Sequence, residues 1–341
     1  MRKLRIAVLM HEELVPPASI EGLTPAEINR FKVEHDVLST LRTMGHEAVA
    51  LGIVDDFAPL RKVLREFKPH VVFNLLAHFH NAAIYESAVV SWLELHKQAY
   101  SGCNPRGIFV ANDKALSKKV LSYHRIRAAR FMVVPRGKSI HRLNKRLQFP
   151  LFVKSASEHA STGIAHASIV RDMAHLKDRV EFIHRNVGTA ALCEQYIEGR
   201  ELTVGILGNK RLEVGPVWEM FLDGLPEGAP KIVTERMKWD LSYQEKVEFN
   251  TGPAELPKEK LESIQKLGRR IYRALGLSGF ARIDMRMDTA GKIWILEANP
   301  NPDLCYGEDF AESFEKLGYT YEALLQKLLN LGMRYHPPWK D

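Results

Sequence analysis

The first third of the chain alternates mainly apolar runs with amphipathic segments. Residues 4–10 and 70–76 have the length and apolar character of buried strands, whereas 26–44 and 85–96 carry apolar residues at helical spacing. Residues 99–102 are expected to add a short strand that leads into a turn. This alternation predicts a βαβ arrangement, in which right-handed crossovers join parallel strands.

The remaining two thirds of the chain are predicted to contain both strands and helices, one of which begins at Asp172. Asn112 is expected to cap a helix that runs to about residue 124. Residues 223–257 are rich in proline, glycine and charge, and a long functional loop region is expected there. Helices are predicted between Pro257 and Gly276 and again at 321–333. Strands are predicted at 131–134, 151–154, 165–170, 192–197 and 201–207.

Composition is that of an ordinary globular protein. Of the 341 residues, 45% are hydrophobic and 26% are charged, and the length suggests two or three domains. The formal charge of +7 is able to steer anionic ligands such as nucleotides, and a solvated basic surface is the alternative explanation. Lysines and arginines are spread along the chain without an aromatic–basic signature, so nucleic-acid binding is not expected.

The chain shows no sign of secretion or of membrane insertion. Its N-terminal apolar run is shorter than that of a signal peptide, and no run approaches the roughly 18 apolar residues of a membrane span. The three cysteines are far apart and form no C-x-x-C motif, which argues against a disulfide framework or a zinc site. We therefore expect a cytoplasmic protein.

A predicted hairpin in the C-terminal third carries the strongest chemical signal. With its turn at 288–291, Arg282 lies opposite Glu297, and Asp284 lies opposite Ile295. Alternate residues of a strand share a face, so Asp284 and Glu297 become diagonal neighbours, about 7–8 Å apart at the backbone. The two carboxylates are then within joint reach of one bound ion.

One face of this hairpin carries Arg282, Asp284, Glu297 and Asn299. Asp and Asn are disfavoured inside strands, so a structural role alone is a poor explanation of this set. The last three side chains supply oxygen ligands to Mg²⁺, which usually keeps waters or substrate phosphates in its remaining positions. The alternative is a surface hairpin in which Arg282 and Glu297 form a cross-strand salt bridge.

Two further segments are candidates for nucleotide contacts. A buried strand ends at Lys154, and the small-residue loop 160–163 follows, in which backbone N–H groups can approach a phosphate. Farther along, a strand breaks at 198–199, where exposed backbone can bind an adenine edge, and Glu201 can accept from ribose hydroxyls. Taken singly, a common polar loop and a polar hairpin connection are the alternatives.

These three pieces occur in this order and together resemble the ATP-grasp superfamily, in particular its D-alanine–D-alanine ligase branch. The motif RID…LEAN at 282–299, preceded by FVK and EQYIEGRE, carries a resemblance that covers nearly the whole chain. It implies an α/β fold in which a parallel βαβ domain precedes two ATP-grasp subdomains whose antiparallel sheets sandwich the nucleotide. The implied domains are an N-terminal substrate domain at 1–105, a small ATP-grasp subdomain at 106–200 and a C-terminal subdomain with the metal site at 201–341.

The resemblance also implies roles for single residues. By motif position, it implies phosphate contacts from Lys114, Lys154, Ser161 and Lys238, adenine contacts from Glu194 and Ile197, and a ribose contact from Glu201. Arg282 resembles the arginine that stabilises the transferring phosphoryl group. Asp284, Glu297 and Asn299 resemble the ligands of two Mg²⁺ ions, with Mn²⁺ as the alternative ion.

The positions that recognise the amino acid depart from the family pattern. The family's G-G-x-S-x-E is replaced at 11–16, its H-G-x-x-G-E-D-G at 77–81 and its N-T-x-P-G-M at 299–303. These changes argue against D-alanine itself as the substrate. The candidates for substrate contact are Glu12, Glu13, His78, His80 and Asp303, and their alternative role is as exposed loop residues.

The function implied is an ATP-dependent carboxylate–amine ligase that forms an amide through an acylphosphate. Its expected partners are a small-molecule carboxylate and an amine, namely amino acids or small peptides, and a second copy of the chain in a homodimer. Residues 223–257, around Lys238 and Trp239, are the candidate lid. The alternatives are an ATP-grasp protein with other carboxylate or phosphoryl chemistry and a non-catalytic ATP-binding module.

Overall fold

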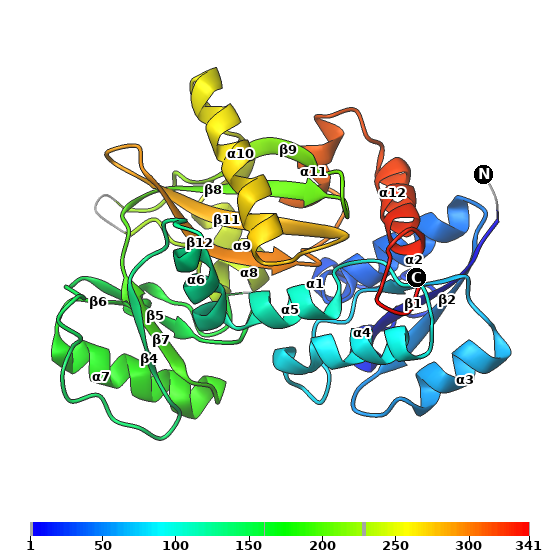
Figure 1. The fold of residues 1–341 in the computed structure, drawn as a ribbon, viewed down its shortest axis with the longest axis horizontal. Helices are drawn as coiled ribbons and strands as arrows, with labels where there is room; N and C mark the ends of the chain where they lie inside the picture. Colours follow the sequence, from blue (N-terminus) through cyan, green and yellow to red (C-terminus); the bar gives the residue numbers. More distant parts are fainter. Residues whose placement is uncertain (1–2, 160, 227–229, 341) are drawn as a thin grey trace.

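The computed structural model describes residues 3–159, 161–226 and 230–340, and it contains three β-sheets (Figure 1). The N-terminal sheet has the strand order β2-β1-β3 and is parallel, as the alternating pattern predicts. Its strands are β1 (Arg5–His11), β2 (Glu47–Ile53) and β3 (Val71–Asn74), and its helices are α1 (Pro25–Asn29), α2 (Lys32–Thr43), α3 (Ala58–Glu66) and α4 (Glu86–Leu95). The sequence pattern did not predict β2 and α3.

Two predictions for this region are wrong in detail. The helix predicted at 26–44 is two helices, because Phe31 leaves the helical conformation between α1 and α2, with φ −126° and ψ 24°. The strand predicted at 99–102 is reduced to a single bridge between Tyr100 and Val72. Neither change moves the carboxyl ends of β1 and β3, where ligands of parallel sheets gather.

The second sheet is antiparallel and has the order β4-β7-β5-β6. Its strands are β4 (Phe131–Val134), β5 (Leu151–Ser155), β6 (Ile169–Val170) and β7 (Ala191–Gln195), and α7 (Met173–Phe182) packs beside them (Figure 1). The strand predicted at 165–170 is shorter than expected, because residues 166–168 form a turn of 3₁₀ helix.

Helices α5 (Pro105–Asn112) and α6 (Lys114–Tyr123) lead into this sheet. The prediction that Asn112 caps the second helix is wrong. Asp113 is the N-cap of α6, since its side chain accepts a hydrogen bond from the Leu116 N–H at 2.8 Å. Asn112 is instead the last residue of α5, and its buried amide donates to Glu86 at 3.0 Å.

The third sheet is antiparallel and has the order β10-β9-β8-β11-β12. Its strands are β8 (Gly199–Leu207), β9 (Glu213–Leu222), β10 (Phe249–Pro253), β11 (Phe280–Asp288) and β12 (Ile293–Pro300), with helices α10 (Lys258–Ala274), α11 (Asp309–Glu315) and α12 (Tyr321–Met333). The region 223–257 is not a loop throughout, because it also contains α8 (Glu235–Trp239) and α9 (Leu241–Lys246) before β10.

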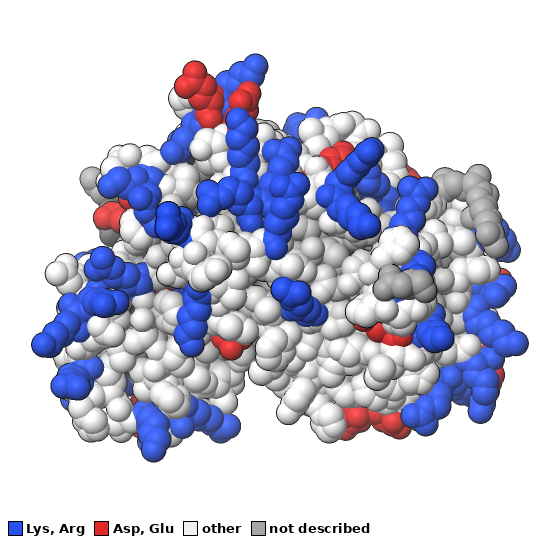
Figure 2. Space-filling view, viewed as in Figure 1, with Lys and Arg blue, Asp and Glu red and all other residues white. Residues whose placement is uncertain are grey.

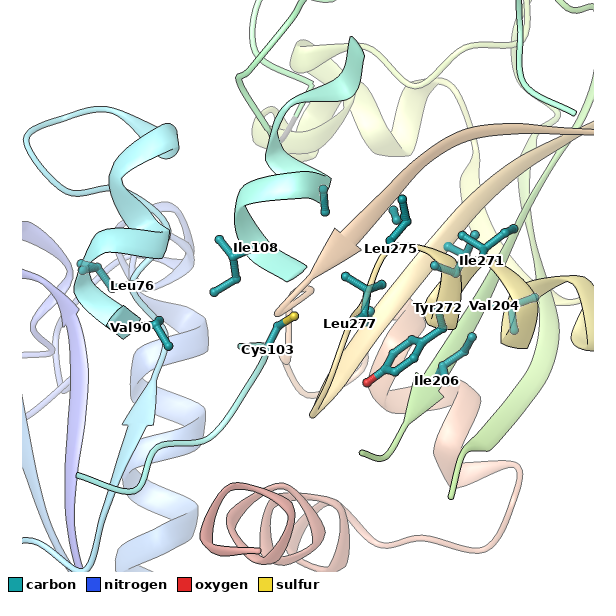
Figure 3. Close-up of a cluster of buried hydrophobic side chains, with 14 of the residues drawn as sticks. Leu76, Val90, Cys103, Ile108, Val204, Ile206, Ile271, Tyr272, Leu275 and Leu277 are labelled. Carbon is teal, nitrogen blue, oxygen red and sulfur yellow. The ribbon is translucent and has the colours of Figure 1, made fainter. Parts of the chain in front are cut away.

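A hydrophobic cluster joins the N-terminal region to the third sheet. It includes Val90 of α4, Ile108 of α5, Val204 of β8 and Ile271 of α10, and Cys103 lies between the two groups (Figure 3). All three cysteines are free and buried. None of the helices in the described ranges has the length and apolar character needed to span a bilayer.

The register of the β11–β12 hairpin differs from the prediction. Next to the turn, Met287 pairs with Ile293 and Met285 with Ile295, which would place Glu297 on the opposite face from Asp284. A β-bulge at Leu296 adds one residue to β12, so that Asp284 pairs directly with Glu297. The four polar residues therefore share a face as predicted, but they are direct rather than diagonal neighbours.

The start of β11 lies against the backbone of the N-terminal region, which gives a stability prediction. Gly279 has φ +67°, and a Cβ built on it would lie 2.2 Å from the Gly102 carbonyl oxygen. Because backbone must move to admit this carbon, Gly279→Ala should lower the free energy of unfolding by about 3 kcal/mol. Urea unfolding measures this loss.

Gly291, in the hairpin turn, provides the matched control. It has a similar φ of +73°, but a Cβ there would meet nothing within 4 Å. Gly291→Ala should therefore cost only about 1 kcal/mol, the strain of a left-handed conformation. Equal losses at the two glycines would show that the approach to Gly102 does not constrain the fold.

Candidate active site

Charged side chains from three segments converge between the second and third sheets. Glu297 on β12 lies 3.6 Å from Lys154 Nζ at the end of β5, measured from its Oε2 atom. The same oxygen is 3.6 Å from Nζ of Lys114, the first residue of α6. Both lysines are almost completely buried. One carboxylate of the hairpin thus connects the two antiparallel sheets through the two predicted phosphate lysines.

Arg282 on β11 is held by two carboxylates. Its Nε and Nη2 atoms donate to the two oxygens of Asp284 at 2.8 and 2.9 Å, and Nη1 donates to Asp309 at 3.0 Å. Burial lowers the pKa of Arg282, but the carboxylates outweigh it and raise the pKa well above its usual range. The guanidinium is therefore a permanent, oriented positive charge beside the predicted metal ligands.

A second charge network lies on β7. Glu194 is buried, and its carboxylate is 2.8 Å from Lys118 Nζ and 3.1 Å from Lys154 Nζ. Burial alone would raise the pKa of Glu194, but the two ammonium groups lower it. Burial lowers the pKa of Lys154, yet Glu194 and Glu297 raise it overall, so this lysine stays protonated. Lys114 has the opposite balance, because burial and the nearby Lys154 lower its pKa.

The predicted metal ligands fit a hard divalent cation. Asp284 and Glu297 are opposed on one face, and the Asn299 amide nitrogen donates to Asp284 at 2.7 Å, which leaves the Asn299 amide oxygen available. The resulting donor set is oxygen only, as Mg²⁺ requires. Among the described residues, no group of three His, Cys, Asp or Glu side chains is arranged for a metal, and the hairpin offers two carboxylates and one amide oxygen.

The loop after β5 binds a carboxylate through its backbone. The Gly163 N–H donates to the side chain of Glu235 on α8 at 2.9 Å, and the Glu235 N–H donates to the Ile164 carbonyl at 2.9 Å. Ser161 lies in this loop with φ +59°. The side chain of Lys238 falls outside the described residues, although α8 itself packs against the loop.

The predicted ribose residue already has a partner. Glu201 forms an ion pair with Arg286 of β11, whose side chain is only 4% exposed. The same guanidinium donates to the carbonyls of Ile197 at 3.1 Å and Lys231 at 2.8 Å. Arg286 therefore links the predicted adenine hinge, the predicted ribose acid and the start of the candidate lid.

The structure places the predicted substrate residues in different parts of the protein. His78 lies near the lysines, since its Nε2 is 3.4 Å from Glu158, whose backbone carbonyl accepts from Lys114 at 2.6 Å. Asp303 follows β12 and accepts from the Cys305 N–H at 2.7 Å. The others, Glu12, Glu13 and His80, are exposed at or beyond strand ends in the N-terminal region.

A buried carboxyl connects the end of β12 to α4 and α5. Glu86 accepts hydrogen bonds from the amides of Asn301 at 2.9 Å and Asn112 at 3.0 Å, and Asn301 also accepts from the Cys103 N–H at 2.8 Å. Burial raises the pKa of Glu86 to about 7, against the lowering effect of the two amides. At pH values between the ordinary pKa of a glutamate and this raised pKa, the Glu86 carboxyl is protonated in the folded protein and ionised in the unfolded chain.

This pKa predicts a pH dependence of stability. Between about pH 4.5 and 7 the unfolded carboxyl ionises first, so the free energy of unfolding should fall by on the order of 2 kcal/mol as the pH rises. Glu86→Gln should remove this part of the slope, which urea unfolding at pH 5 and pH 8 measures. Glu66→Gln, at an exposed carboxylate of α3, should keep it. An unchanged slope in Glu86→Gln would contradict the assignment.

Three residues of the site were missed by sequence reasoning. Lys118 lies one turn after Lys114 on α6, so helical spacing places it on the same face. Arg286 follows Asp284 by two residues on β11, so strand alternation places it on the site face. No sequence pattern predicts the contact of Asp309 with Arg282, because the path of the chain from β12 to α11 cannot be read from residue spacing.

Two antiparallel sheets that enclose lysines, an arginine and the oxygen ligands of a hairpin define an ATP-grasp protein. Comparison with known proteins confirms this class. Residues 115–330 match the family model described as D-ala D-ala ligase C-terminus. The chain belongs to this family and is an ATP-dependent carbon–nitrogen ligase. The resemblance seen in the sequence is thereby confirmed.

Relatives and solved structures agree over most of the chain. The D-alanine–D-alanine ligase of Desulforudis audaxviator is 27% identical over 299 residues, 87% of this chain and 91% of that protein. The uncharacterized protein y4sG of Sinorhizobium fredii is 27% identical over 312 residues, 89% of this chain and 88% of that protein. A Bacillus anthracis D-alanine–D-alanine ligase complexed with ATP has the same fold, with a TM-score of 0.74, 22% identity and coverage of 97% and 98%.

Proposed function

We propose that this protein joins a small-molecule carboxylate to an amine through an acylphosphate. A carboxylate oxygen of the first substrate attacks the γ-phosphorus of ATP, and the bond to ADP breaks. The amine then attacks the acyl carbon, the bond to phosphate breaks, and the amide nitrogen loses a proton. The observation that carries the proposal is the convergence of Lys114, Lys154 and Glu297 between the two antiparallel sheets.

The residues of the site meet the electrostatic demand of the first step. Attack of one anion on another is opposed by repulsion, and phosphoryl transfer relies mainly on positioning and charge neutralisation. Lys154 and Lys114 supply positive charge from one side, and Arg282 supplies it from the other. A divalent metal held by Asp284, Glu297 and Asn299 would neutralise phosphate oxygens when bound.

Charge balance supports two metal ions. The side chains of the site pair four cations with four carboxylates, which are Lys114, Lys118, Lys154 and Arg282 with Glu194, Glu297, Asp284 and Asp309. ATP adds about four negative charges, so two divalent cations restore neutrality in a low-dielectric site. We propose Mg²⁺ for both ions, with Mn²⁺ as the alternative.

We further propose Glu194 and Ile197 as the adenine hinge, Glu201 as the ribose residue, and Ser161 and Lys238 as phosphate contacts. Arg286 then exchanges its bonds with Ile197 and Glu201 for contacts to the nucleoside. The region from Lys231 to α9 is the proposed lid, because it bonds both to Arg286 and to the loop after β5. Closure of this lid would protect the acylphosphate from water.

The substrates proposed are amino acids or short peptides other than D-alanine. Glu12, Glu13 and Asp303 are proposed to attract a substrate ammonium group, and His78 and His80 to line the same side. Exchange of each for alanine should raise the substrate KM and leave the KM for ATP unchanged. If all five variants had an unaltered substrate KM, the proposed substrate site would be wrong.

The activity is tested by screening amino acids and short peptides for ADP release, with mass detection of products. ADP release that requires both an acid and an amine, together with a product of their summed mass less water, is the expected result. ADP release without an amine would favour other carboxylate or phosphoryl chemistry, and tight ATP binding without turnover would favour a non-catalytic module. We also propose the domain division 1–105, 106–200 and 201–341, a homodimer and a cytoplasmic location.

A further inference from the structure

One segment of the chain is basic without any compensating acidic residue, although the lysines and arginines as a whole are spread along the chain. Residues 114–157 contain six lysines, six arginines and neither aspartate nor glutamate. This segment carries a formal charge of +12, whereas the whole chain carries +7, so the remainder is net acidic. Figure 2 shows many blue and few red side chains on the lobe that holds α7 and β4–β7. Such asymmetry points to an anionic partner.

Part of this charge lines a groove with a volume of about 610 Å³. The groove lies between the end of α6, the segment 125–131 and the loop at 144–147. Its polar walls include Arg125, Arg127, Arg130, Arg146, Asn144 and Lys118. None of its described lining residues is acidic, and the four arginines are exposed and take part in no salt bridge within the described ranges.

Local contacts hold two of these arginines over the groove. The Arg127 guanidinium lies over the ring of Trp294, 5.2 Å from its centroid. Arg130 donates to the backbone carbonyl of Arg146 at 3.4 Å, so the two flanking segments meet through it. These contacts order the side chains without neutralising them. Like charges held together are mutually destabilising, and a bound anion removes that cost.

The groove is separate from the proposed ATP phosphates. Lys118 lines the groove and also belongs to the charge network of the candidate active site. Its side chain is only 2% exposed, and its charge is paired with Glu194. Three of the arginines lie on the connection from α6 to β4, and the fourth lies in the loop at 144–147. The proposed phosphate lysines Lys114 and Lys154 lie instead at the start of α6 and near the end of β5.

The chemistry of the walls selects the ligand. Guanidinium groups bind phosphate through paired N–H donors in a fixed fork, which an ammonium group cannot do. A volume of about 610 Å³ falls within the range of small-molecule sites and exceeds the needs of one phosphate. We propose that this arginine groove is a second anion site, which takes a small molecule with clustered phosphate groups. The proposal does not depend on the substrates of the ligase.

Calorimetry with the full-length chain tests the site. Inorganic tripolyphosphate is titrated into protein whose nucleotide site is saturated with ADP, in the absence of added metal. One further binding event is expected, and Arg125→Gln/Arg127→Gln/Arg130→Gln should weaken it about tenfold or more. Lys62→Gln/Arg65→Gln/Lys68→Gln removes three charges from exposed positions of α3 and the loop after it, and this matched control should bind normally.

Further measurements keep the test decisive. The groove variant should remain folded and bind ADP with wild-type affinity, because its three side chains are exposed. The corresponding triple lysine variant keeps the charge and loses the fork, so it should bind tripolyphosphate more weakly than wild type. The proposal would be overturned if both triple glutamine variants bound tripolyphosphate equally, or if no binding remained once ADP was present. It would also be overturned if citrate bound as tightly as tripolyphosphate, or if single-stranded DNA bound more tightly.

Discussion

An Asp284→Asn/Glu297→Gln variant should form ADP at least about a thousandfold more slowly than the wild type. The change keeps the size of both side chains but removes the two carboxylates that we propose as metal ligands, which pair directly beside the bulge. Charges that stabilise the transition state more than the bound substrate lower the barrier of the chemical step. Their removal therefore lowers the rate of that step. A coupled assay of ADP formation measures the loss, and Mn²⁺ binding by calorimetry should disappear in parallel.

Asp288→Asn provides the control on the same hairpin. The Asp288 carboxylate accepts from the backbone N–H of Lys292 and from the Trp294 indole, both at 2.8 Å, and it stands outside the site. This variant should turn over at nearly the wild-type rate, at the expense of some stability. Normal ADP formation by the Asp284/Glu297 double variant would remove the metal from this hairpin and with it the proposed mechanism.

Lys154→Ala should lower kcat/KM for ATP by about 10²–10³-fold. Lys154 is the one lysine in contact with both Glu194 and Glu297 among the residues described, and its raised pKa keeps it charged. Removing a preorganised charge that faces the proposed phosphate site should cost a few kcal/mol of transition-state stabilisation. Steady-state kinetics at varied ATP concentration measure the effect.

The neighbouring lysines make this variant interpretable. After the change, Glu194 keeps Lys118 and Glu297 keeps Lys114, so no buried carboxylate is left unpaired and the fold should survive. Lys138→Ala, at an exposed lysine of the same lobe, should match the wild type. Unchanged kinetics and an intact melting temperature in the Lys154→Ala protein would place the phosphates away from β5.

The sequence predicted those helices and strands in which apolar and polar residues alternate with a regular period. Strands β1 and β3, α12 and the polar face of the hairpin follow directly from periodicity, and the family motif selected the two lysines, Lys114 and Lys154, that the structure brings to Glu297. The register of the hairpin did not follow, because a bulge leaves no mark in the sequence that distinguishes Leu296 from its neighbours. The pairing of Arg286 with Glu201 was equally hidden, since it joins strands that only the folded sheet brings together.

The extra residue in β12 sets which side of the strand faces the ATP site. If Leu296 were paired regularly instead of bulged, Asp284 would pair with Leu296, and Glu297 and Asn299 would turn to the opposite face of the sheet. Lengthening the turn at 289–290 would leave that orientation unchanged. Deleting Leu296 would keep Glu297 opposite Asp284, so changes in length are tolerable at the tip and at the bulged position. One residue inserted between Glu297 and Asn299 would instead put these two side chains on opposite faces.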